Sequence, residues 1–568
     1  MMKKRTSFCL AALLILSMLA ACAGPAATGT APGGTAPAPG GTAPAPGTAA
    51  EADAGRPDFG EAFSEAPWWP EPQTFSMWMP MGRIAGVRPN WGYNLIYRTM
   101  AEITNVTIEF HHPPVGSETE AFNLMVASGD LPDAIMHGWL GAPGGPMNFI
   151  NNGTIIPLND LMPVYSPNTL EWFRERPDVL REIILDDGSL YVLPSVYYHL
   201  DLAVHTGPIV RADMAALIGI SWDDFPMSIG QWEEMLIAVR DHPELGGQGV
   251  IPFSFQMIQH FNNPIFVGAW GIAQEWFQRE GTALFGAVQP EYKEFLTLLN
   301  RWWDMGLLDP EFAANTQAMT DEKILGDRIF SFFGGMGFAI TRYTGLARPS
   351  NPDFQLIPVH FPPLNPGEVA PLGHETPWNQ GGVAITSQAR DPGMILRFFD
   401  YFYSYQGHVL SNWGIQGYTF DYNPDGSRFF LPLVVDNPEG LPRDQAMAAY
   451  TIWQAVSPVY KKRYVLEQRD SLPEQLRGRR YWMEPPNYIL MPPVTPTADE
   501  ATEFANIMID INNFYREQAT AMIMGSIPLD PGFDNMVNTL YGMGMGRAVD
   551  LRQAALDRYF ARPMPQFD

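Results

Sequence analysis

The alternation of strand and helix patterns after residue 73 restricts the fold of this chain more than any other feature. Residues 74–80 (TFSMWMP) alternate and are rich in β-forming side chains, which predicts a strand. Residues 94–112 predict a helix that leads into the strand VTIEFHH, and residues 120–139 predict a helix, a turn and the strand DAIMH. Strands that alternate with helices form a largely parallel sheet with right-handed crossovers, so the sequence predicts an α/β fold.

The later part of the chain is dominated by helical patterns. Residues 227–242 predict a helix capped by Ser228, and residues 495–525 predict a long helix. Thr497 and Glu500 stand at the spacing of a capping box at the start of that long helix. The remaining segments are interpreted as a helix over 291–308, a helical stretch over 392–412 and two short buried strands, GGMGFAIT (334–341) and GGVAITSQ (381–388).

The first 66 residues do not carry a globular pattern. Residues 1–21 join a basic start to an apolar run of roughly a dozen residues, which predicts a secretion signal and is shorter than the about 20 residues of a membrane span. The run ends in LAAC, which resembles the bacterial lipobox and makes Cys22 the expected lipidation site. Ordinary signal cleavage, with Cys22 incidental, is the alternative. Residues 22–66 repeat GGTAPAP and form a low-complexity tether.

Charge and cysteine content exclude several functions. The formal charge is -26, and it becomes -29 when residues 1–21 are removed, because they hold three cations and no acid. So acidic a chain is a poor ligand for nucleic acid and has no polybasic grip on lipid. The two cysteines, Cys9 and Cys22, lie in the signal and at the lipidation site, so no disulfide framework is expected and packing must stabilise the fold.

Several segments together resemble one family. They include ASGDLPDAIM (127–136), DDGSLYVLP (186–194), FFDYFYSYQGHVLSNWGIQGYTF (398–420) and TPTADEATEF (495–504). In their order, and behind a lipobox and a tether, they resemble the extracellular solute-binding lipoproteins of ABC importers, specifically the large carbohydrate-type (family 1) members. The resemblance covers nearly all of residues 70–560.

The resemblance implies a two-lobed periplasmic-binding-protein-like fold of type II, with a hinge between the lobes and a helical C-terminal part. We place lobe one at 68–193 plus 379–440, and lobe two at 194–378 plus 441–568. Ligand is expected between the lobes, and closure of the hinge around it is what a permease would recognise.

Aromatic side chains beside polar ones at predicted strand ends are the candidate ligand contacts. Aromatic planes cover the C–H faces of sugars, and a few placed polar groups bind the hydroxyls. Each tryptophan could equally belong to a core, and for Trp413 packing is the preferred interpretation. The candidates are Trp78, Trp91, His137, Trp139, Tyr198, Trp270, Trp378 and Asn379.

No metal and no cofactor is predicted. His111 and His112 are neighbours on a predicted strand, so their side chains point to opposite faces and cannot easily chelate one ion. Relatives of this size often carry an Asp-rich loop that resembles a calcium site. The corresponding stretch here is RDHPELGGQGVIP, in which Asp241 and Glu244 alone cannot supply the six or more oxygens that calcium needs.

The leading hypothesis is a monomeric, lipid-anchored protein on the extracellular face of the cell membrane. It would capture a carbohydrate, most simply an oligosaccharide, and deliver it to the permease subunits of an ABC importer. A receptor for a peptide or another polar solute is one alternative. A surface glycan-degrading enzyme is another, although G-x-S-x-G, H-E-x-x-H and G-x-x-x-x-G-K-[ST] motifs are absent from the sequence.

Overall fold

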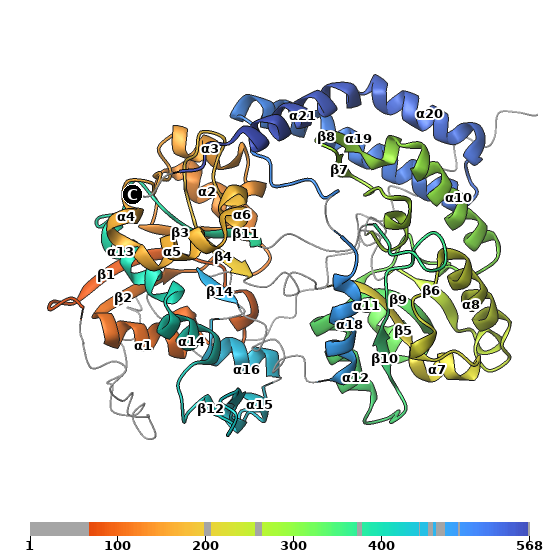
Figure 1. Ribbon diagram of the computed structural model, residues 1–568, viewed down its shortest axis with the longest axis horizontal. Coiled ribbons are helices and arrows are strands. Elements are labelled where there is room, and N and C mark those ends of the chain that lie inside the picture. The colour runs from red at the N-terminus through yellow and green to blue at the C-terminus, as the bar shows by residue number, and fades with distance from the viewer. Residues whose placement is uncertain are drawn as a thin grey trace, which may run out of the picture. The chain divides into compact units, whose positions relative to one another are not determined.

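A computed structural model gives the fold (Figure 1). It describes residues 68–197, 206–255, 264–371, 378–441, 443–452, 458–461, 472–486 and 489–565. Residues 57–568 cluster as one compact unit. Cys22, the signal, the tether and Tyr198 lie outside the described residues, and of Trp378 and Asn379 only the backbone is described.

A six-stranded mixed sheet organises the first lobe, with strand order β14-β4-β11-β3-β1-β2. Its strands are β1 (Gln73–Trp78), β2 (Val106–His111), β3 (Ala134–His137), β4 (Leu193–Tyr197), β11 (Trp378–Ile385) and β14 (Val459–Lys461). The predicted parallel arrangement is confirmed for β1, β2 and β3. β11 runs antiparallel to both of its neighbours, β3 and β4.

The strands that enter or leave this sheet toward the second one lie side by side. β4 ends at Tyr197, β14 ends at Lys461 and β11 begins at Trp378. In the register, Lys461 pairs with Tyr197, and Trp378 pairs with Val196. All three connections therefore leave one end of three adjacent strands.

Helices cover both faces of the first sheet. Successive side chains of β1 point to opposite faces, so each face contributes apolar side chains that a helix can cover. Phe75 packs on Phe398 and Phe399 of α13, whereas Trp78 packs on Phe122 of α2. The helices of this region are α1 (Leu95–Thr104), α2 (Glu118–Ser128), α3 (Gly145–Asn151), α4 (Met162–Tyr165), α5 (Pro167–Glu175), α6 (Pro177–Ile183), α13 (Pro392–Asp400) and α14 (Tyr405–Trp413), with the 3-10 turns η2 (Gly82–Ile84), η3 (Trp91–Tyr93), η4 (Trp139–Gly141) and η12 (Tyr401–Tyr403).

A four-stranded sheet, ordered β10-β5-β9-β6, organises the second lobe and has its own hydrophobic core. Its strands are β5 (Thr206–Arg211), β6 (Ile251–Ser254), β9 (Ile329–Gly335) and β10 (Leu356–Pro358). The surrounding helices are α7 (Ala212–Leu217), η6 (Trp222–Asp224), α8 (Ile229–Asp241), η7 (Gly246–Gln248), α9 (Pro264–Val267), η9 (Gly268–Trp270), η10 (Gly286–Val288), α10 (Pro290–Asp304), α11 (Gln317–Leu325), α12 (Arg342–Ala347) and α18 (Pro473–Met483).

The predicted strand over 334–341 is wrong for most of its length. The strand β9 covers the preceding apolar run and ends at Gly335, and residues Met336–Thr341 form a π-helical turn, η11, that runs into α12. The prediction for 381–388 is largely confirmed, since β11 extends to Ile385.

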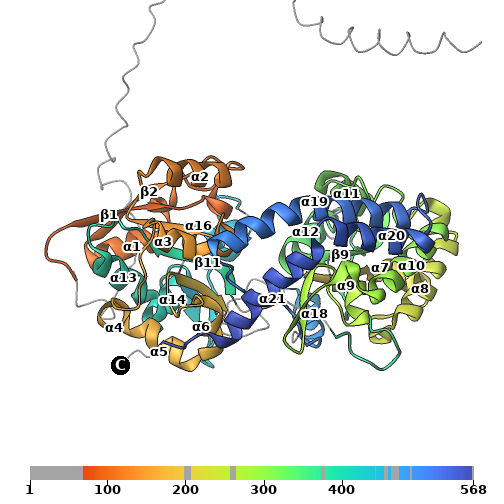
Figure 2. The ribbon, with the colours of Figure 1, turned by 90° about the horizontal axis from the view of Figure 1, so that it is seen from above.

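Two hairpins and a helical C-terminal part complete the body. The helices α19, α20 and α21 pack on one another (Figure 2). These elements are the hairpins β7 (Trp276–Arg279) with β8 (Thr282–Phe285) and β12 (Phe420–Tyr422) with β13 (Arg428–Phe430), and the helices α15 (Pro432–Val435), α16 (Arg443–Tyr450), α19 (Ala498–Ile523), α20 (Leu529–Gly542) and α21 (Met545–Ala561).

The structure differs from the predicted lobe boundary at residue 441. β14 pairs with β4 in the first sheet, and Met447 and Tyr450 of α16 share a satellite core with Trp413. α16 and β14, which that boundary assigns to lobe two, therefore pack with elements of the first lobe. The expected packing role of Trp413, which is fully buried, is confirmed.

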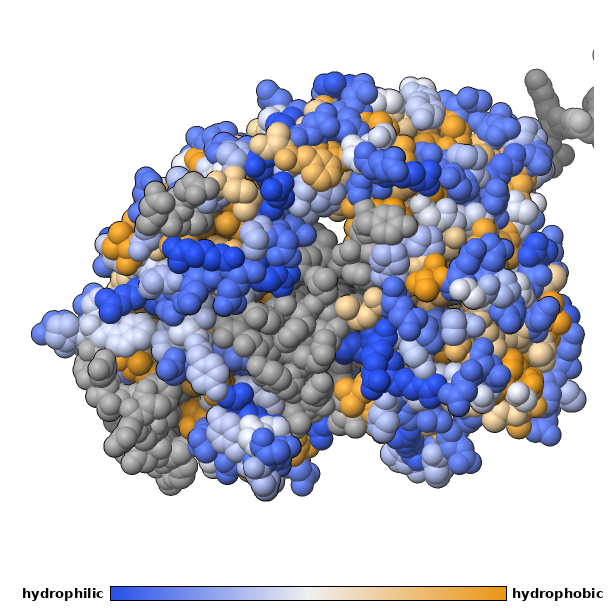
Figure 3. Space-filling model, in the orientation of Figure 1, coloured by the Kyte–Doolittle hydropathy of each residue, from blue (hydrophilic) through white to orange (hydrophobic). Residues whose placement is uncertain are grey.

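Apolar residues form neither a broad patch on the drawn face nor a membrane-spanning helix among the described residues. The face of the molecule in Figure 3 is mostly hydrophilic, with apolar residues scattered over it. Within the described part of the chain, no helix combines the length and the apolar character needed to cross a bilayer.

Candidate functional site

Three of the predicted contacts meet around one phenylalanine at the ends of β1 and β3. The ring of His137 stacks on Phe122 of α2, with centroids 3.8 Å apart and planes 10° apart. Trp78 and Trp139 pack edge-on against the same phenylalanine, at 5.9 and 5.8 Å. We call these four residues the aromatic cluster. Because β1 and β3 are neighbouring parallel strands, their carboxyl ends bring these side chains to one edge of the sheet.

The members of the aromatic cluster differ in what they leave accessible. Trp139 is 0 % exposed, and its indole N–H donates to the carbonyl oxygen of Gly382 at 3.2 Å. Trp78 is 5 % exposed, so both tryptophans have a packing role here. His137 is partly exposed, and its ring nitrogens have no hydrogen-bond partner among the described residues. Burial lowers the pKa of His137 to about 4, so the neutral ring offers one donor and one acceptor.

A cavity of about 300 Å³ adjoins this cluster on the α2 side of the sheet. That volume is at the lower end for small-molecule sites and suits one ring of a larger ligand. Trp78 lies in both the cavity wall and the aromatic cluster. The cavity is lined by Ser76, Trp78, His111, Met125, Asp130, Leu131 and Pro132.

Asp133 fixes the turn beside this cavity. Its carboxylate accepts hydrogen bonds from the backbone N–H and the hydroxyl of Ser76, both at 2.7 Å, and from the N–H of Arg390 at 3.1 Å. Burial alone would raise the pKa of Asp133, but the hydrogen bonds from Ser76 outweigh it and the pKa is lowered. The carboxylate is therefore ionised, and its hydrogen bonds hold the turn before β3 against β1.

Two glycines allow β11 to approach the aromatic cluster. A Cβ on Gly382 would lie 2.2 Å from the carbonyl oxygen of Leu193, and one on Gly381 would lie 2.9 Å from that of His137. The pairing of β11 with β4 also shifts register between Trp378 and Gly382. Such irregularities re-aim side chains and are common beside binding sites. The backbone of Trp378 and Asn379 thus lies on the strand next to the cluster, and their ligand contact stays a prediction.

Trp91 and Trp270 are placed elsewhere. Trp91 is 2 % exposed, packs edge-on against Tyr97 and donates its indole N–H to the carbonyl of Pro80 at 3.0 Å. Trp270 is half-buried against α10 in the second lobe, where its N–H donates to Glu294 Oε2 at 2.8 Å. Neither ring contacts the aromatic cluster within the described part of the chain, so a ligand role for either remains a prediction.

The two neighbouring histidines point opposite ways, as their positions on one strand predict. His111 lines the cavity, whereas the Nδ1 of His112 lies 2.6 Å from the carbonyl oxygen of Met79 and its Nε2 accepts from the N–H of Trp91. Across the described ranges, no group of three or more His, Cys, Asp or Glu side chains is arranged to hold a metal ion. Asp241, one of the two acids of the stretch RDHPELGGQGVIP, accepts hydrogen bonds from Arg240.

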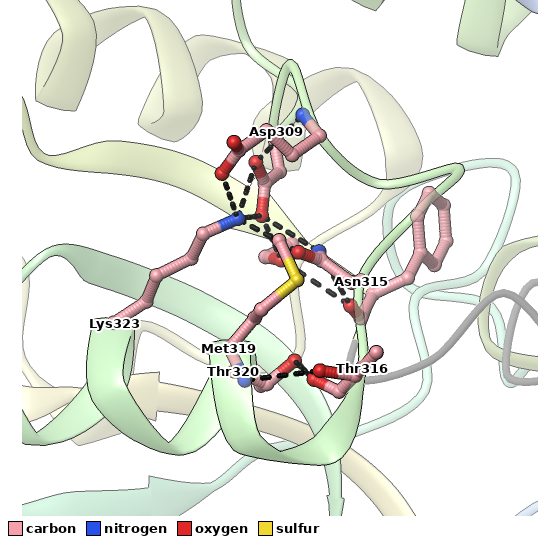
Figure 4. A network of polar contacts seen from close by, with 9 residues as sticks. Asp309, Asn315, Thr316, Met319, Thr320 and Lys323 are labelled. Atoms are coloured by element: carbon pink, nitrogen blue, oxygen red, sulfur yellow. Dashed lines mark hydrogen bonds and ion pairs between the residues drawn. The ribbon is translucent and has the colours of Figure 1, made fainter. Parts of the chain in front are cut away.

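In the second lobe a buried ionic network fixes the carboxyl end of β6 (Figure 4). Asp309 accepts from Lys323 Nζ at 2.8 and 3.0 Å, from Asn315 at 2.8 Å and from the hydroxyl of Ser254 at 2.7 Å. Lys323 also donates to the amide oxygen of Asn315 at 2.7 Å. Burial opposes ionisation of Asp309, but these bonds, that of Lys323 foremost, lower its pKa. A fully paired network of this kind holds the strand end rigidly.

Of the seven cavity residues, sequence reasoning selected only Trp78. Among the polar residues that it missed, Ser76 and His111 belong to strands that were predicted, and Asp130 belongs to the turn before β3. The two-residue period places Ser76 on the same face as Trp78, and the parallel register places His111 opposite Trp78. A correct pairing of the predicted strands would therefore have indicated that Ser76 and His111 lie beside Trp78.

The sequence was compared with protein families and with individual known proteins. No family model matches the chain. It is 24% identical over 463 residues to the fructooligosaccharide ABC transporter substrate-binding protein FusA of Streptococcus pneumoniae serotype 4, which spans 78% of this chain and 83% of that protein.

Three solved structures share the fold over most of their length. The alginate-binding protein AlgQ2 without calcium ion has a TM-score of 0.68 at 21% identity, covering 87% of this chain and 99% of its own. FusA in complex with kestose has a TM-score of 0.67 at 21% identity, covering 86% and 100%. An HMO-binding solute-binding protein from Bifidobacterium longum infantis has a TM-score of 0.68 at 16% identity, covering 86% and 99%. The described body therefore has the fold that these three structures share.

Proposed function

We propose that this chain, a solute-binding protein of the carbohydrate type that works with an ABC importer, captures an oligosaccharide and delivers it to the importer's permease. The observation that carries this proposal is the sequence relationship to a fructooligosaccharide-binding protein over 78% of the chain, joined to a shared fold. Relatives of the same fold bind fructooligosaccharide, alginate or HMO, so the proposal names an oligosaccharide and no particular linkage.

The first lobe supplies the contacts that we propose for one sugar ring. The cavity beside Trp78 offers an aromatic wall, with His111, Ser76 and Asp130 as polar groups. His137 keeps a neutral ring next to that wall, its nitrogens are not bonded by any described residue, and stacking on Phe122 fixes its orientation. A neutral imidazole can donate to one hydroxyl and accept from another. We include Trp378 and Asn379 as the contacts from β11.

The experiment that tests the function is a thermal-shift screen of the full-length chain against oligosaccharides, short peptides and polyamines, with chromatography of the same mixtures. A solute that binds only the native state raises the melting temperature by mass action. A shift with one glycan class and no product is the expected result. Shifts only with peptides or polyamines would overturn the carbohydrate proposal, and glycan turnover would show an enzyme instead.

Replacing Trp378 with Ala tests the β11 contact once a glycan is identified. Loss of one aromatic contact should weaken binding by about 1–2 kcal/mol. The matched variant is Trp303→Ala, whose ring packs against Phe312 in the second lobe. Calorimetry that finds equal dissociation constants for Trp378→Ala and the unaltered protein would remove Trp378 from the site.

We also propose that Cys22 carries a lipid anchor and that residues 23–66 hold the body away from the membrane. A Pro-rich spacer extends by at most about 3 Å per residue. Cys22→Ser should move the protein from the membrane fraction to the medium while glycan affinity stays constant. Retention of the variant in membranes would contradict the anchor.

A further inference from the structure

Arg552 of α21 is an unusual cation in this molecule. Its guanidinium carbon lies 4.5 Å from the centre of the Phe504 ring on α19 and 5.5 Å from that of Trp276 on β7. The two rings lie 5.4 Å apart at an interplanar angle of 50°. All three residues are half-buried, and we call them together the aromatic notch.

The other two arginines of α21 are paired with carboxylates. Arg547 makes two hydrogen bonds of 2.8 Å to Glu503, and Arg558 bonds to Glu500 and to Asp186. Arg552 makes no hydrogen bond or ion pair with any residue that the structure describes, and its Nε is buried without a partner. Acids outnumber bases in this chain by 61 to 35, so a shortage of carboxylates does not explain the difference.

Glu275 is the carboxylate that attracts Arg552, but it already accepts hydrogen bonds from other residues. Glu275 raises the pKa of Arg552, but burial dominates and lowers that pKa to about 10. Glu275 Oε1 accepts from Tyr515 at 2.8 Å and from Arg516 at 2.6 Å. At neutral pH the notch therefore holds a positive charge that no described residue pairs by a hydrogen bond, and leaving such a donor unpaired is costly.

We propose that the notch of Arg552, Trp276 and Phe504 is a binding site for the carboxylate of an acidic sugar. A guanidinium offers paired donors that match a planar carboxylate, and such charge-assisted bonds are the strong ones. The exposed parts of the two rings supply an apolar wall for the C–H face of the sugar that carries the carboxylate. An anion seated here would supply the partner that Arg552 lacks.

This site is distinct from the first-lobe cavity, and its test does not depend on which neutral glycan the chain captures. The probes are digalacturonate, its neutral counterpart galactobiose, and inorganic sulfate, each titrated calorimetrically into the full-length chain. The variants are Arg552→Met and Arg552→Lys, with Arg547→Met as the matched control on the same helix.

Digalacturonate should bind the unaltered protein at least tenfold more tightly than Arg552→Met, with Arg552→Lys between them because it keeps the charge but loses the paired donors. Arg547→Met should bind like the unaltered protein. The melting temperature of Arg552→Met should be equal or higher, because the substitution removes an uncompensated buried charge.

Equal binding of digalacturonate by Arg552→Met and the unaltered protein, or no binding by either, would overturn the site. Equal affinity for galactobiose and digalacturonate would overturn the role of the carboxylate. Binding of sulfate but not digalacturonate would overturn the acidic sugar as ligand. A glycan that binds elsewhere should have the same affinity for Arg552→Met and for the unaltered protein. Failure of this site is therefore distinguishable from failure of the proposed function.

Discussion

His137 and Trp139 stand two residues apart and take different roles. Trp139 is buried, and its indole N–H donates to the carbonyl oxygen of Gly382. His137 stacks on Phe122, and its ring nitrogens bond to no described residue. Burial holds the His137 ring neutral, with a pKa of about 4. Of the aromatic cluster, His137 is therefore the side chain best placed to exchange hydrogen bonds with a solute.

His137→Phe should separate the packing of that ring from its chemistry. Unfolded histidine binds a proton near pH 6.5, and folded His137 binds one only near 4, so the unfolded state holds more protons between these values and stability falls as pH drops from about 6.5 to 4. His137→Phe keeps the stack but cannot titrate. Its melting temperature should fall less steeply over this range, and glycan binding should weaken by about 1 kcal/mol for a lost hydrogen bond.

The control for His137→Phe is His360→Phe in the second lobe. Burial, with a contribution from Arg477, lowers the pKa of His360 to about 4 as well. His360→Phe should also flatten the pH dependence of the melting temperature, yet bind glycan like the unaltered protein. Equal loss of glycan affinity in both variants would remove the specific role of His137.

At the scale of elements, the sequence correctly predicted the helix starts that depend only on neighbouring residues. The cap at Ser228 and the capping box of Thr497 with Glu500 are present as expected, because a cap needs only residues within one turn. Residues 392–412 were expected to be continuously helical, but the chain forms α13, a 3-10 turn and α14, with Ser404 capping the second helix.

The elements that sequence reasoning missed depend on distant partners. The strand β9 ends at Gly335, and the following turn packs on α18, where Gln475 donates to the carbonyl oxygen of Met336 at 2.7 Å from 139 residues away in sequence. The same limit applies to the site. The ends of β1 and β3 were correctly expected to carry Trp78 and His137, but the burial of Trp139 depends on Gly382, 243 residues away in sequence.

Gly382→Ala tests the close approach of β11 to β4. The new methyl group would lie 2.2 Å from the carbonyl oxygen of Leu193, which is backbone and cannot move aside cheaply. Overpacking of this kind should cost about 1–3 kcal/mol in the free energy of unfolding, measured in urea. The matched variant is Gly230→Ala in α8, where the methyl group meets nothing within 4 Å and should be neutral or stabilising. Equal stability of the two variants would contradict the tight fit.

At the scale of the whole molecule, the two sheets have separate cores, and Asp186 joins the C-terminal helix to the first lobe. Asp186 accepts from Arg558 Nε at 2.7 Å, from Arg562 Nε at 3.0 Å and from the hydroxyl of Thr495 at 2.8 Å. Arg562 is 4 % exposed, so Asp186 neutralises a charge that water cannot reach. The last turn of α21 is therefore tied to a turn of the first lobe.

Asp186→Asn should destabilise the protein because it leaves Arg562 buried without its carboxylate. Removing one partner of a buried pair costs roughly 3–5 kcal/mol, and the half-buried state of Asp186 puts the expected loss near the lower value. Asp187→Asn is the control, since Asp187 is exposed and accepts only a backbone hydrogen bond from Ser189. Urea midpoints that are the same for both variants would contradict the structural role of Asp186.

The three connections between the sheets leave from neighbouring strands, β14, β4 and β11, at the same end. We expect the lobes to rotate about the line that these three strand ends define. The two lobes should then have one soft degree of freedom. A single spin-label distance, followed as glycan is added, would describe the whole of that motion.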